Sequence, residues 1–129
     1  MRAESQAEWE IRAYQRSLAA GEVVFEPGEA GHHFYVIRSG EVELQSADPS
    51  VQEPLALLGA GDFFGEYAAM LGEQRELRAV AKQATRVLAV DRESLESICR
   101  ESPEIALRIA RGLAARLGAA FGPRSQAGA

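Results

Sequence analysis

The sequence predicts a mainly β fold, a sandwich or barrel of short strands accompanied by helices. Between residues 22 and 90, short apolar runs recur about every 8–12 residues, and the first three are rich in β-branched or aromatic side chains. Glycine, proline, serine or aspartate bounds each run, as expected where the chain turns. After residue 91 the apolar residues follow helical spacing instead. The expected order is therefore one N-terminal helix, a β-barrel and two C-terminal helices.

Residues 5–18 fit an amphipathic helix. Ile11, Tyr14 and Leu18 recur at i, i+3 and i+7, and charged or polar residues separate them. Trp9 lies off this stripe, so we expect it to pack against a different neighbour. This interval is the predicted N-terminal helix.

Six runs are predicted to be strands. Ser39 and Gly40 lie between the second and third runs, where a tight hairpin turn needs the positive φ that glycine adopts readily. The strands make up a barrel over about residues 20–90. Their expected ranges are 22–25, 34–37, 42–44, 55–58, 76–82 and 85–90.

Two helices are predicted from local signals around the last strands. A compact apolar run at residues 67–71 predicts a short helix over residues 65–71, beginning at a glycine. Asp91 is a good N-cap, and Glu93 in the first turn suits the helix dipole. The second helix is expected to continue through Cys99, which we interpret as a buried small apolar residue.

A longer final helix is expected to start at Ser102 and Pro103, an N-cap and first-turn pair. The two C-terminal helices cover about residues 91–121, and residues 122–129 are expected to be a disordered tail. The final helix carries an apolar stripe that we interpret as core or as a dimer seam, made of Ile105, Ile109, Leu113 and Leu117.

Composition narrows the function classes. The chain has 129 residues, of which 47% are hydrophobic and 26% charged, and this suits one domain over residues 1–129. A formal net charge of −5 argues against a nucleic-acid partner, because such surfaces are usually basic. No apolar run is long enough for a membrane helix, and one cysteine cannot form an internal disulfide. We therefore expect a soluble cytoplasmic protein.

The residues most indicative of chemistry are Gly65, Glu66 and Arg75. Gly65 permits close backbone approach to a ligand, and the first N–H groups of the helix after it favour an anion. The Glu66 carboxylate can accept hydrogen bonds from a pair of hydroxyl groups. Arg75 can return from the next strand as a phosphate clamp. Together these groups suit a sugar phosphate with a free ribose hydroxyl.

Over about residues 20–119 the sequence resembles the cyclic-nucleotide-binding domain family. The resemblance begins with Gly21-Glu22-Val23-Val24-Phe25-Glu26-Pro27-Gly28, Gly31 and Ser39-Gly40. It centres on Phe64-Gly65-Glu66-Tyr67-Ala68 with Arg75, and it ends with Thr85-Arg86-Val87-Leu88-Ala89-Val90 and two helices. It implies a jelly-roll (double-stranded β-helix) barrel in which the short helix belongs to a phosphate-binding cassette.

The resemblance also implies roles for individual residues. Glu66 would bind the ribose 2′-hydroxyl, Arg75 the exocyclic phosphate oxygens, and the backbone from Gly65 to Ala68 the phosphate. The final helix would move over the pocket, with Leu117 or Phe121 as a lid. The implied ligand is cAMP or another cyclic nucleotide, with no cofactor, no metal and no catalysis. The full set of expected ligand-binding residues is Phe64, Gly65, Glu66, Tyr67, Ala68, Arg75, Glu76 and Leu77.

The chain departs from the family pattern directly after the arginine. Small residues are usual there, whereas this chain has Glu76, Leu77 and Arg78. A carboxylate about 5 Å from a phosphate, at an effective dielectric constant near 20, costs roughly 3 kcal/mol. Glu76 could cancel the clamp, swing outward, or pair with Arg75 or Arg78. A three-residue slip would make Arg78 the clamp instead.

Two further features have simpler interpretations. His32 and His33 are interpreted as solvated loop residues, because adjacent residues on an extended chain point apart and no third metal ligand is evident. The same argument disfavours a barrel metalloenzyme of the cupin type. Tyr67 stands where the family often has leucine, and it either packs in the core or lines the pocket.

Two functions remain open at this point. The first is a sensor whose C-terminal helices relay cyclic-nucleotide occupancy to a protein partner or to self-association. The second is a degenerate cyclic-nucleotide fold that acts as an interaction or assembly module. Since residue 129 follows soon after Phe121, we expect no helix-turn-helix, so that the output passes to another molecule.

Overall fold

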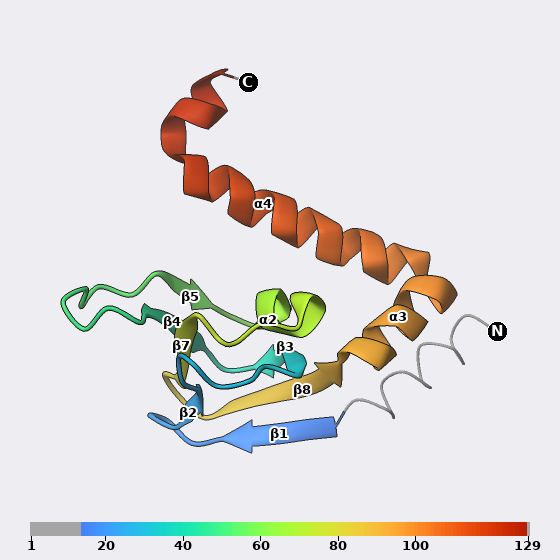
Figure 1. Cartoon of the computed structure of the whole chain (residues 1–129), viewed down its shortest axis with the longest axis horizontal. Coiled ribbons are helices and arrows are strands. Elements are labelled where there is room, and N and C mark those ends of the chain that lie inside the picture. The colour runs from blue at the N-terminus through green and yellow to red at the C-terminus, as the bar shows by residue number, and fades with distance from the viewer. Residues whose placement is uncertain (1–13, 129) are drawn as a thin grey trace.

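The computed structural model describes residues 14–128, and it describes side chains from residue 14 to residue 118. Within these residues, eight strands form two antiparallel sheets and three helices accompany them (Figure 1). The strands are β1 (Tyr14–Leu18), β2 (Val23–Phe25), β3 (His33–Ser39), β4 (Val42–Ser46), β5 (Ala56–Leu58), β6 (Phe63–Phe64), β7 (Leu77–Ala81) and β8 (Thr85–Asp91). The helices are α2 (Glu66–Leu71), α3 (Arg92–Glu101) and α4 (Pro103–Gly128).

The two sheets pack on each other as a jelly-roll-like sandwich. One sheet has the order β1-β8-β3-β6 and the other β2-β7-β4-β5, so consecutive strands repeatedly change sheet. The inner faces share an apolar core, which explains why the predicted strands are apolar runs. This architecture confirms the predicted fold class. The fully buried side chains of this core include Ile37, Val42, Phe64 and Val87.

The first described element differs from the prediction. Residues 14–18 form strand β1 and not the end of a helix, with Tyr14 opposite Ala89 and Leu18 opposite Thr85 on β8. Leu18 enters the core, while the rest of β1 is mostly exposed. An edge strand with one inward residue leaves too few apolar positions to distinguish a period of 2 from one of 3.6. The other residues of the predicted helix, including Trp9 and Ile11, lie outside the described residues.

The turn at Ser39-Gly40 has the predicted backbone but a different role. Gly40 has a φ of 97°, yet β3 and β4 belong to different sheets, so the turn is a corner and not a hairpin. A Cβ atom on Gly40 would lie 2.4 Å from Thr85 Oγ1. The Thr85 hydroxyl accepts a hydrogen bond from the Glu41 N–H at 3.1 Å. The close approach to β8 and the left-handed backbone both require glycine here.

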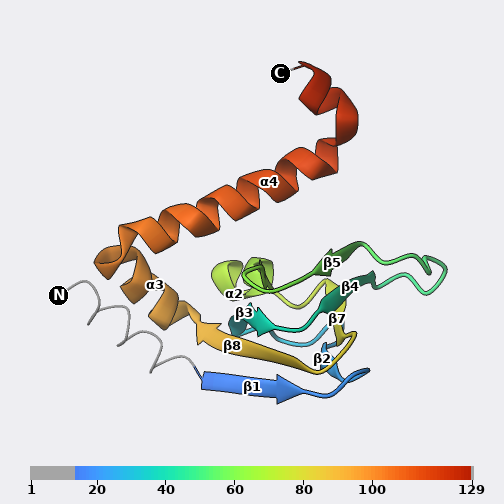
Figure 2. The ribbon, with the colours of Figure 1, turned by 180° about the vertical axis from the view of Figure 1, so that it is seen from behind.

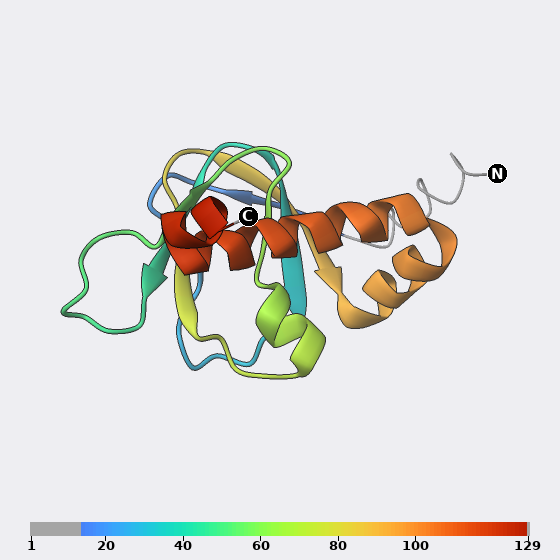
Figure 3. The same cartoon turned by 90° about the horizontal axis from the view of Figure 1, so that it is seen from above.

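The helices lie along one side of the sandwich. Figures 1 and 2 show α4 crossing above α2 and the strands, and Figure 3 shows α3 turning back at one end. Asp91 caps α3 as predicted, because its carboxylate accepts from the Ser94 N–H at 2.7 Å. A second apolar cluster lies between the helices and the β1-β8-β3-β6 sheet. It includes Phe34, Phe63, Leu95 and Ile98, with Ile105, Ile109 and Leu113 of α4 packed against it.

Three details of the helical part differ from expectation. Cys99 is exposed and not buried, because α3 buries the face that carries Ser94, Leu95 and Ile98. Leu117 does not continue the buried stripe of α4 and is 60% exposed. The final helix continues to Gly128, beyond the expected end near residue 121 and through most of the expected tail.

Candidate functional site

The cassette residues converge on one small cavity at which α4 faces the sandwich. Seven of the eight predicted ligand-binding residues line it, together with Phe25, Leu44 and Arg116, and its volume is about 70 Å³. The exception is Phe64, which is fully buried in the core and stacks on Tyr35 at 5.2 Å between ring centroids. The predicted site is therefore a single place in the fold, with Phe64 beneath it. The seven are Gly65, Glu66, Tyr67, Ala68, Arg75, Glu76 and Leu77.

Arg75 forms the inner wall of this cavity and is only 6% exposed. Its Nη1 donates to the Gly65 carbonyl at 2.8 Å, and its Nη2 donates to the His33 carbonyl at 2.6 Å. The guanidinium lies over the Phe25 ring, 4.1 Å from the centroid. Burial lowers the pKa of Arg75, and Tyr35 and nearby carboxylates oppose this shift. Because carbonyls and an aromatic face hold it, the positive charge of Arg75 is fixed in place with no ion-pair partner among the described residues.

Two glycines make room for that guanidinium. A Cβ atom on Gly31 would lie 2.5 Å from Ala68 Cβ and 2.7 Å from Arg75 Cζ. Gly65 has a φ of 83°, and its Cβ would lie 3.0 Å from Arg75 Nη1. Backbone bonds join the same segments, since the Arg75 N–H donates to the Glu29 carbonyl at 2.7 Å. These two glycines thus leave the space that the Arg75 side chain occupies.

Glu66 and Arg116 close the cavity from the α4 side. Arg116 Nη1 donates to Glu66 Oε2 at 2.8 Å, with 14% of the Glu66 side chain and 33% of the Arg116 side chain exposed. The other carboxylate oxygen, Glu66 Oε1, is buried and has no hydrogen-bond partner within the described part of the chain. Buried polar atoms are normally hydrogen-bonded, so this acceptor marks a place where a hydroxyl donor would be stabilised.

The start of α2 also lines the cavity with backbone N–H groups. Gly65 occupies the N-cap position, and no side chain caps the helix. The Ala69 N–H donates to the Gly65 carbonyl at 3.4 Å, a long hydrogen bond. The N–H groups before it have no partner within the helix, as in any helix start. They add donors beside Glu66 and Arg75.

Tyr67 and Glu76 lie at the outer rim of the cavity. Tyr67 is 46% exposed, so the core-packing interpretation is wrong, and its side chain lines the cavity. Glu76 is exposed, and it forms no hydrogen bond or ion pair among the described residues. The carboxylates whose charge acts on Arg75 are Glu29 and Glu66. Glu76 therefore does not neutralise the clamp in this conformation.

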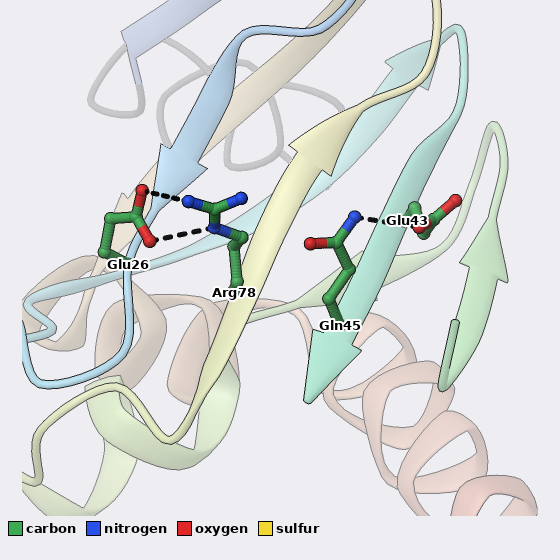
Figure 4. Close-up of polar contacts among 4 residues, drawn as sticks. All are labelled: Glu26, Glu43, Gln45 and Arg78. Carbon is green, nitrogen blue, oxygen red and sulfur yellow. Dashed lines mark hydrogen bonds and ion pairs between the residues drawn. The ribbon is translucent and has the colours of Figure 1, made fainter. Parts of the chain in front are cut away.

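Arg78 forms an ion pair with Glu26, outside the cavity. Its guanidinium donates from Nε and Nη2 to the two Glu26 oxygens, each at 2.9 Å (Figure 4). It does not line the cavity, so neither a slipped clamp at Arg78 nor a Glu76–Arg78 pair occurs. Figure 4 also shows Gln45 donating to Glu43 at 2.8 Å on the neighbouring strand β4. The polar side chains drawn in Figure 4 therefore belong to a region distinct from the cavity.

The residue of α4 that covers the cavity is not one of the two apolar residues expected as a lid. Leu117 is exposed and does not line the cavity, and the side chain of Phe121 lies outside the described residues. Arg116 occupies that position instead, with its Cζ 4.6 Å from the Phe63 ring centroid. Sequence reasoning missed Arg116. The available signal was its i+4 spacing from Gly112, which approaches the same ring.

The two adjacent histidines lie in different surroundings. His32 is exposed, whereas His33 is half-buried at the start of β3 and meets Tyr14 edge-on at 5.5 Å, so only His32 is a solvated loop residue. Among residues 14–128, no group of three or more His, Cys, Asp or Glu side chains could hold a metal ion. In the same range, no helix is both long and apolar enough to cross a membrane.

Comparison with known proteins places these residues in context. The family model described as "Cyclic nucleotide-binding domain" matches residues 15–102. The cyclic AMP receptor protein of Thermus thermophilus is 38% identical over 106 residues, which are 81% of this chain and 49% of that protein. A cyclic nucleotide-gated potassium channel of Mesorhizobium japonicum is 32% identical over 111 residues, covering 85% of this chain and 30% of the channel.

The solved structures give the same likeness. The crystal structure of the Thermus thermophilus catabolite activator protein matches with a TM-score of 0.79 and 33% identity, over 92% of this chain and 56% of that one. The chain thus spans about half or less of the length of these curated relatives.

Proposed function

The chain belongs to the cyclic nucleotide-binding domain family, and from this premise we propose that it is a non-enzymatic sensor of a cyclic nucleotide, cAMP or cGMP. The proposed ligand lies between Glu66 and Arg75. The relay of occupancy runs through α4 to a protein partner or to self-association. No nucleic-acid partner forms part of the proposal.

One observation carries the ligand assignment: Glu66 Oε1 is a buried acceptor without a partner, in the cavity that Arg75 walls. A ribose 2′-hydroxyl supplies the missing donor to that oxygen. Arg75 keeps guanidinium N–H groups beyond the two that bind carbonyls, and these can donate to a phosphate oxygen. A neutral sugar would satisfy only Glu66, and an isolated phosphate would be repelled by it. A sugar phosphate matches both groups.

Binding requires the cavity to open. Its volume of about 70 Å³ is far below the roughly 300–1,000 Å³ of typical ligand pockets. The Arg116–Glu66 ion pair occupies part of the ribose position, so the ligand has to displace Arg116. Because Arg116 belongs to α4, the ligand binds the open and closed positions of that helix with different affinities. This difference in affinity is what a relay requires.

Glu76 lowers the proposed affinity only modestly. Its side chain is exposed, so the dielectric constant of water is the better reference than the value near 20 used above. At the same separation of about 5 Å, the repulsion of a phosphate is then about 1 kcal/mol. Glu76→Ser should raise nucleotide affinity by less than about tenfold.

The test is a calorimetric titration of the purified chain with cAMP, cGMP and cyclic di-GMP. Arg75→Ala should weaken binding of the preferred nucleotide by about 10- to 100-fold, because hydrogen bonds to charged groups contribute about 1.5–3 kcal/mol. Arg78→Ala is the matched control, since Arg78 pairs with Glu26 outside the cavity. Glu66→Gln preserves the side-chain shape and should lose affinity even if Arg75→Ala folds poorly.

The same titrations can contradict the proposal. An absence of heat and of thermal stabilisation with all three nucleotides, for wild type and for Glu76→Ser, would leave the interaction module as the better description. Equal losses in Arg75→Ala and Arg78→Ala would place the ligand elsewhere. For the relay, size-exclusion chromatography with and without nucleotide should show a change in self-association or in partner binding.

A further inference from the structure

A second, larger groove lies on the opposite side of Arg116 from the cassette cavity, between α4 and the β1-β8-β3-β6 sheet. Its volume is about 670 Å³, within the roughly 300–1,000 Å³ typical of pockets for small organic ligands. Helix α4 covers the groove, so it suits a small molecule better than a protein surface. Its apolar walls include Phe34 and Val36 of β3, Leu88 of β8, Ile98 of α3, and Ile105 and Ile109 of α4.

Positive charge borders these apolar walls. Arg38 at the end of β3 and Arg108 on α4 both line the groove and are exposed. Neither forms a hydrogen bond or ion pair with the described residues. The one acidic residue among the described lining residues is Asp62, whose Oδ2 already accepts from the Gly59 N–H at 2.8 Å. The rim therefore offers two uncommitted guanidinium groups to an anion.

We propose that this groove binds one amphipathic carboxylate, a free fatty acid of medium chain length. The alkyl chain lies against the apolar walls, and the carboxylate accepts hydrogen bonds from Arg38 and Arg108. A guanidinium binds a carboxylate through two parallel hydrogen bonds, which suits this headgroup better than an alcohol or an amine. A cyclic nucleotide is a poor occupant, since none of the described lining residues of the groove offers its ribose hydroxyls a buried carboxylate oxygen without a partner, as Glu66 does in the cassette cavity.

Arg116 connects this groove with the cassette cavity, because its side chain lines both. A fatty acid in the groove holds α4 away from the sheet and attracts Arg116 from Glu66. The fatty acid and a nucleotide should then change each other's affinity by the same factor. This coupling rests on the proposed function, whereas fatty-acid binding itself does not.

The test is a titration of the purified full chain, free of nucleotide, with sodium dodecanoate below its critical micelle concentration. Calorimetry should show one molecule bound per chain. Decanoate should bind about 15-fold more weakly than dodecanoate, because each buried methylene raises affinity about fourfold. Methyl dodecanoate, which lacks the charge, should bind about tenfold more weakly than dodecanoate, and Arg38→Ala/Arg108→Ala should remove that difference.

A matched pair of variants on α4 locates the site. Ala115 lines the groove and Ala114 does not, although both are exposed. Ala115→Leu should weaken dodecanoate binding at least tenfold by filling the groove, and Ala114→Leu should leave it unchanged. Arg75→Ala should also leave it unchanged.

The proposal is overturned if wild type does not bind dodecanoate or if the two leucine variants bind it equally. It is also overturned if Arg75→Ala abolishes binding, which would place the fatty acid in the cassette cavity. Failure of the nucleotide titrations with dodecanoate binding intact would count against the proposed sensor function alone.

Discussion

The cassette cavity has two arginine walls that the fold holds in different ways. Arg75 is 6% exposed, lies against Phe25, and donates to the carbonyls of Gly65 and His33. Arg116 reaches in from α4 with 33% of its side chain exposed, and Glu66 is its one ion-pair partner in the described part of the chain. One positive charge is built into the sandwich, and the other comes from a helix that covers it.

In the proposed sensor, this difference would separate ligand recognition from the conformational response. A cation fixed by backbone carbonyls keeps its position whether or not an anion is bound, so its binding geometry is preorganised. A partly exposed ion pair is weak, typically about 0–1 kcal/mol, and a ligand can replace it at low cost. A site with one wall of each kind can bind tightly on one side and change conformation on the other.

We call Arg75 the fixed wall of the cavity and Arg116 the movable wall. The largest effect on stability should follow from a substitution at Gly31, which lies against the fixed wall. Gly31→Ala places a Cβ atom 2.5 Å from Ala68 Cβ, both of them in packed surroundings. Overpacking of this kind costs about 1–3 kcal/mol in the free energy of unfolding, which urea denaturation measures. Gly59→Ala is the control, because nothing lies within 4 Å of its Cβ position. If both variants were equally stable, the fixed wall would be more adaptable than the contacts indicate.

A smaller effect should follow from the substitution Gly112→Ala, which weakens the packing of α4 on the sandwich. A Cβ atom there would lie 2.4 Å from Phe63 Cε1, the ring that also packs against Arg116. In Gly112→Ala, amide hydrogen exchange in α4 should accelerate about tenfold, since local opening becomes about 1.4 kcal/mol easier. Gly118→Ala should not accelerate exchange, because its Cβ position is open and alanine favours the helix. Equal protection in both variants would rule out Phe63 as the seat of α4.

The ion pair between Arg116, the movable wall, and Glu66 should contribute less to the free energy of unfolding. A double-mutant cycle of Arg116→Ala and Glu66→Gln should give a coupling energy below about 1 kcal/mol, since the pair is partly exposed. The coupling should decrease further in 1 M salt, as the Debye length falls to about 3 Å. A coupling of about 3 kcal/mol or more would mean that α4 is locked as firmly as Arg75.

The smallest effect concerns the pH dependence of the fixed wall. Burial lowers the pKa of His33, with Asp91 opposing the shift and His32 and Arg75 adding to it. The folded state therefore favours the neutral imidazole. The contribution of His33 to the stability of the fold is complete above its pKa in the unfolded chain, about 6.5, and is lost as the pH falls below that value. When the pH falls from about 8 to about 5.5, the free energy of unfolding of His33→Gln should decrease less than that of wild type. Urea denaturation at each pH measures this difference.

His32→Gln serves as the control for that experiment, because His32 is exposed. It should lose stability on acidification as wild type does. A wild-type-like loss in His33→Gln would assign the pH dependence to other groups.

Elements with strong local signals were predictable from sequence. The Asp91 cap, the short helix after Gly65 and six strands appear close to their expected positions. Capping and turn residues act within a few residues, so their effect is readable along the chain. Strands β1 and β6 were not predicted, because each is defined mainly by the strand it pairs with: β8 for one, β3 for the other.

The candidate site divides in the same way. The sequence by itself determined that the residues from Gly65 to Leu77 come together around Arg75, because these residues are close in the chain and carry the family's spacing. Only the tertiary structure decided that Arg78 binds Glu26, that Glu76 remains exposed, and that Arg116 closes the cavity. Those outcomes depend on contacts between side chains about 50 residues apart, or on which face of the sheet a strand turns to solvent. No local pattern specifies such contacts.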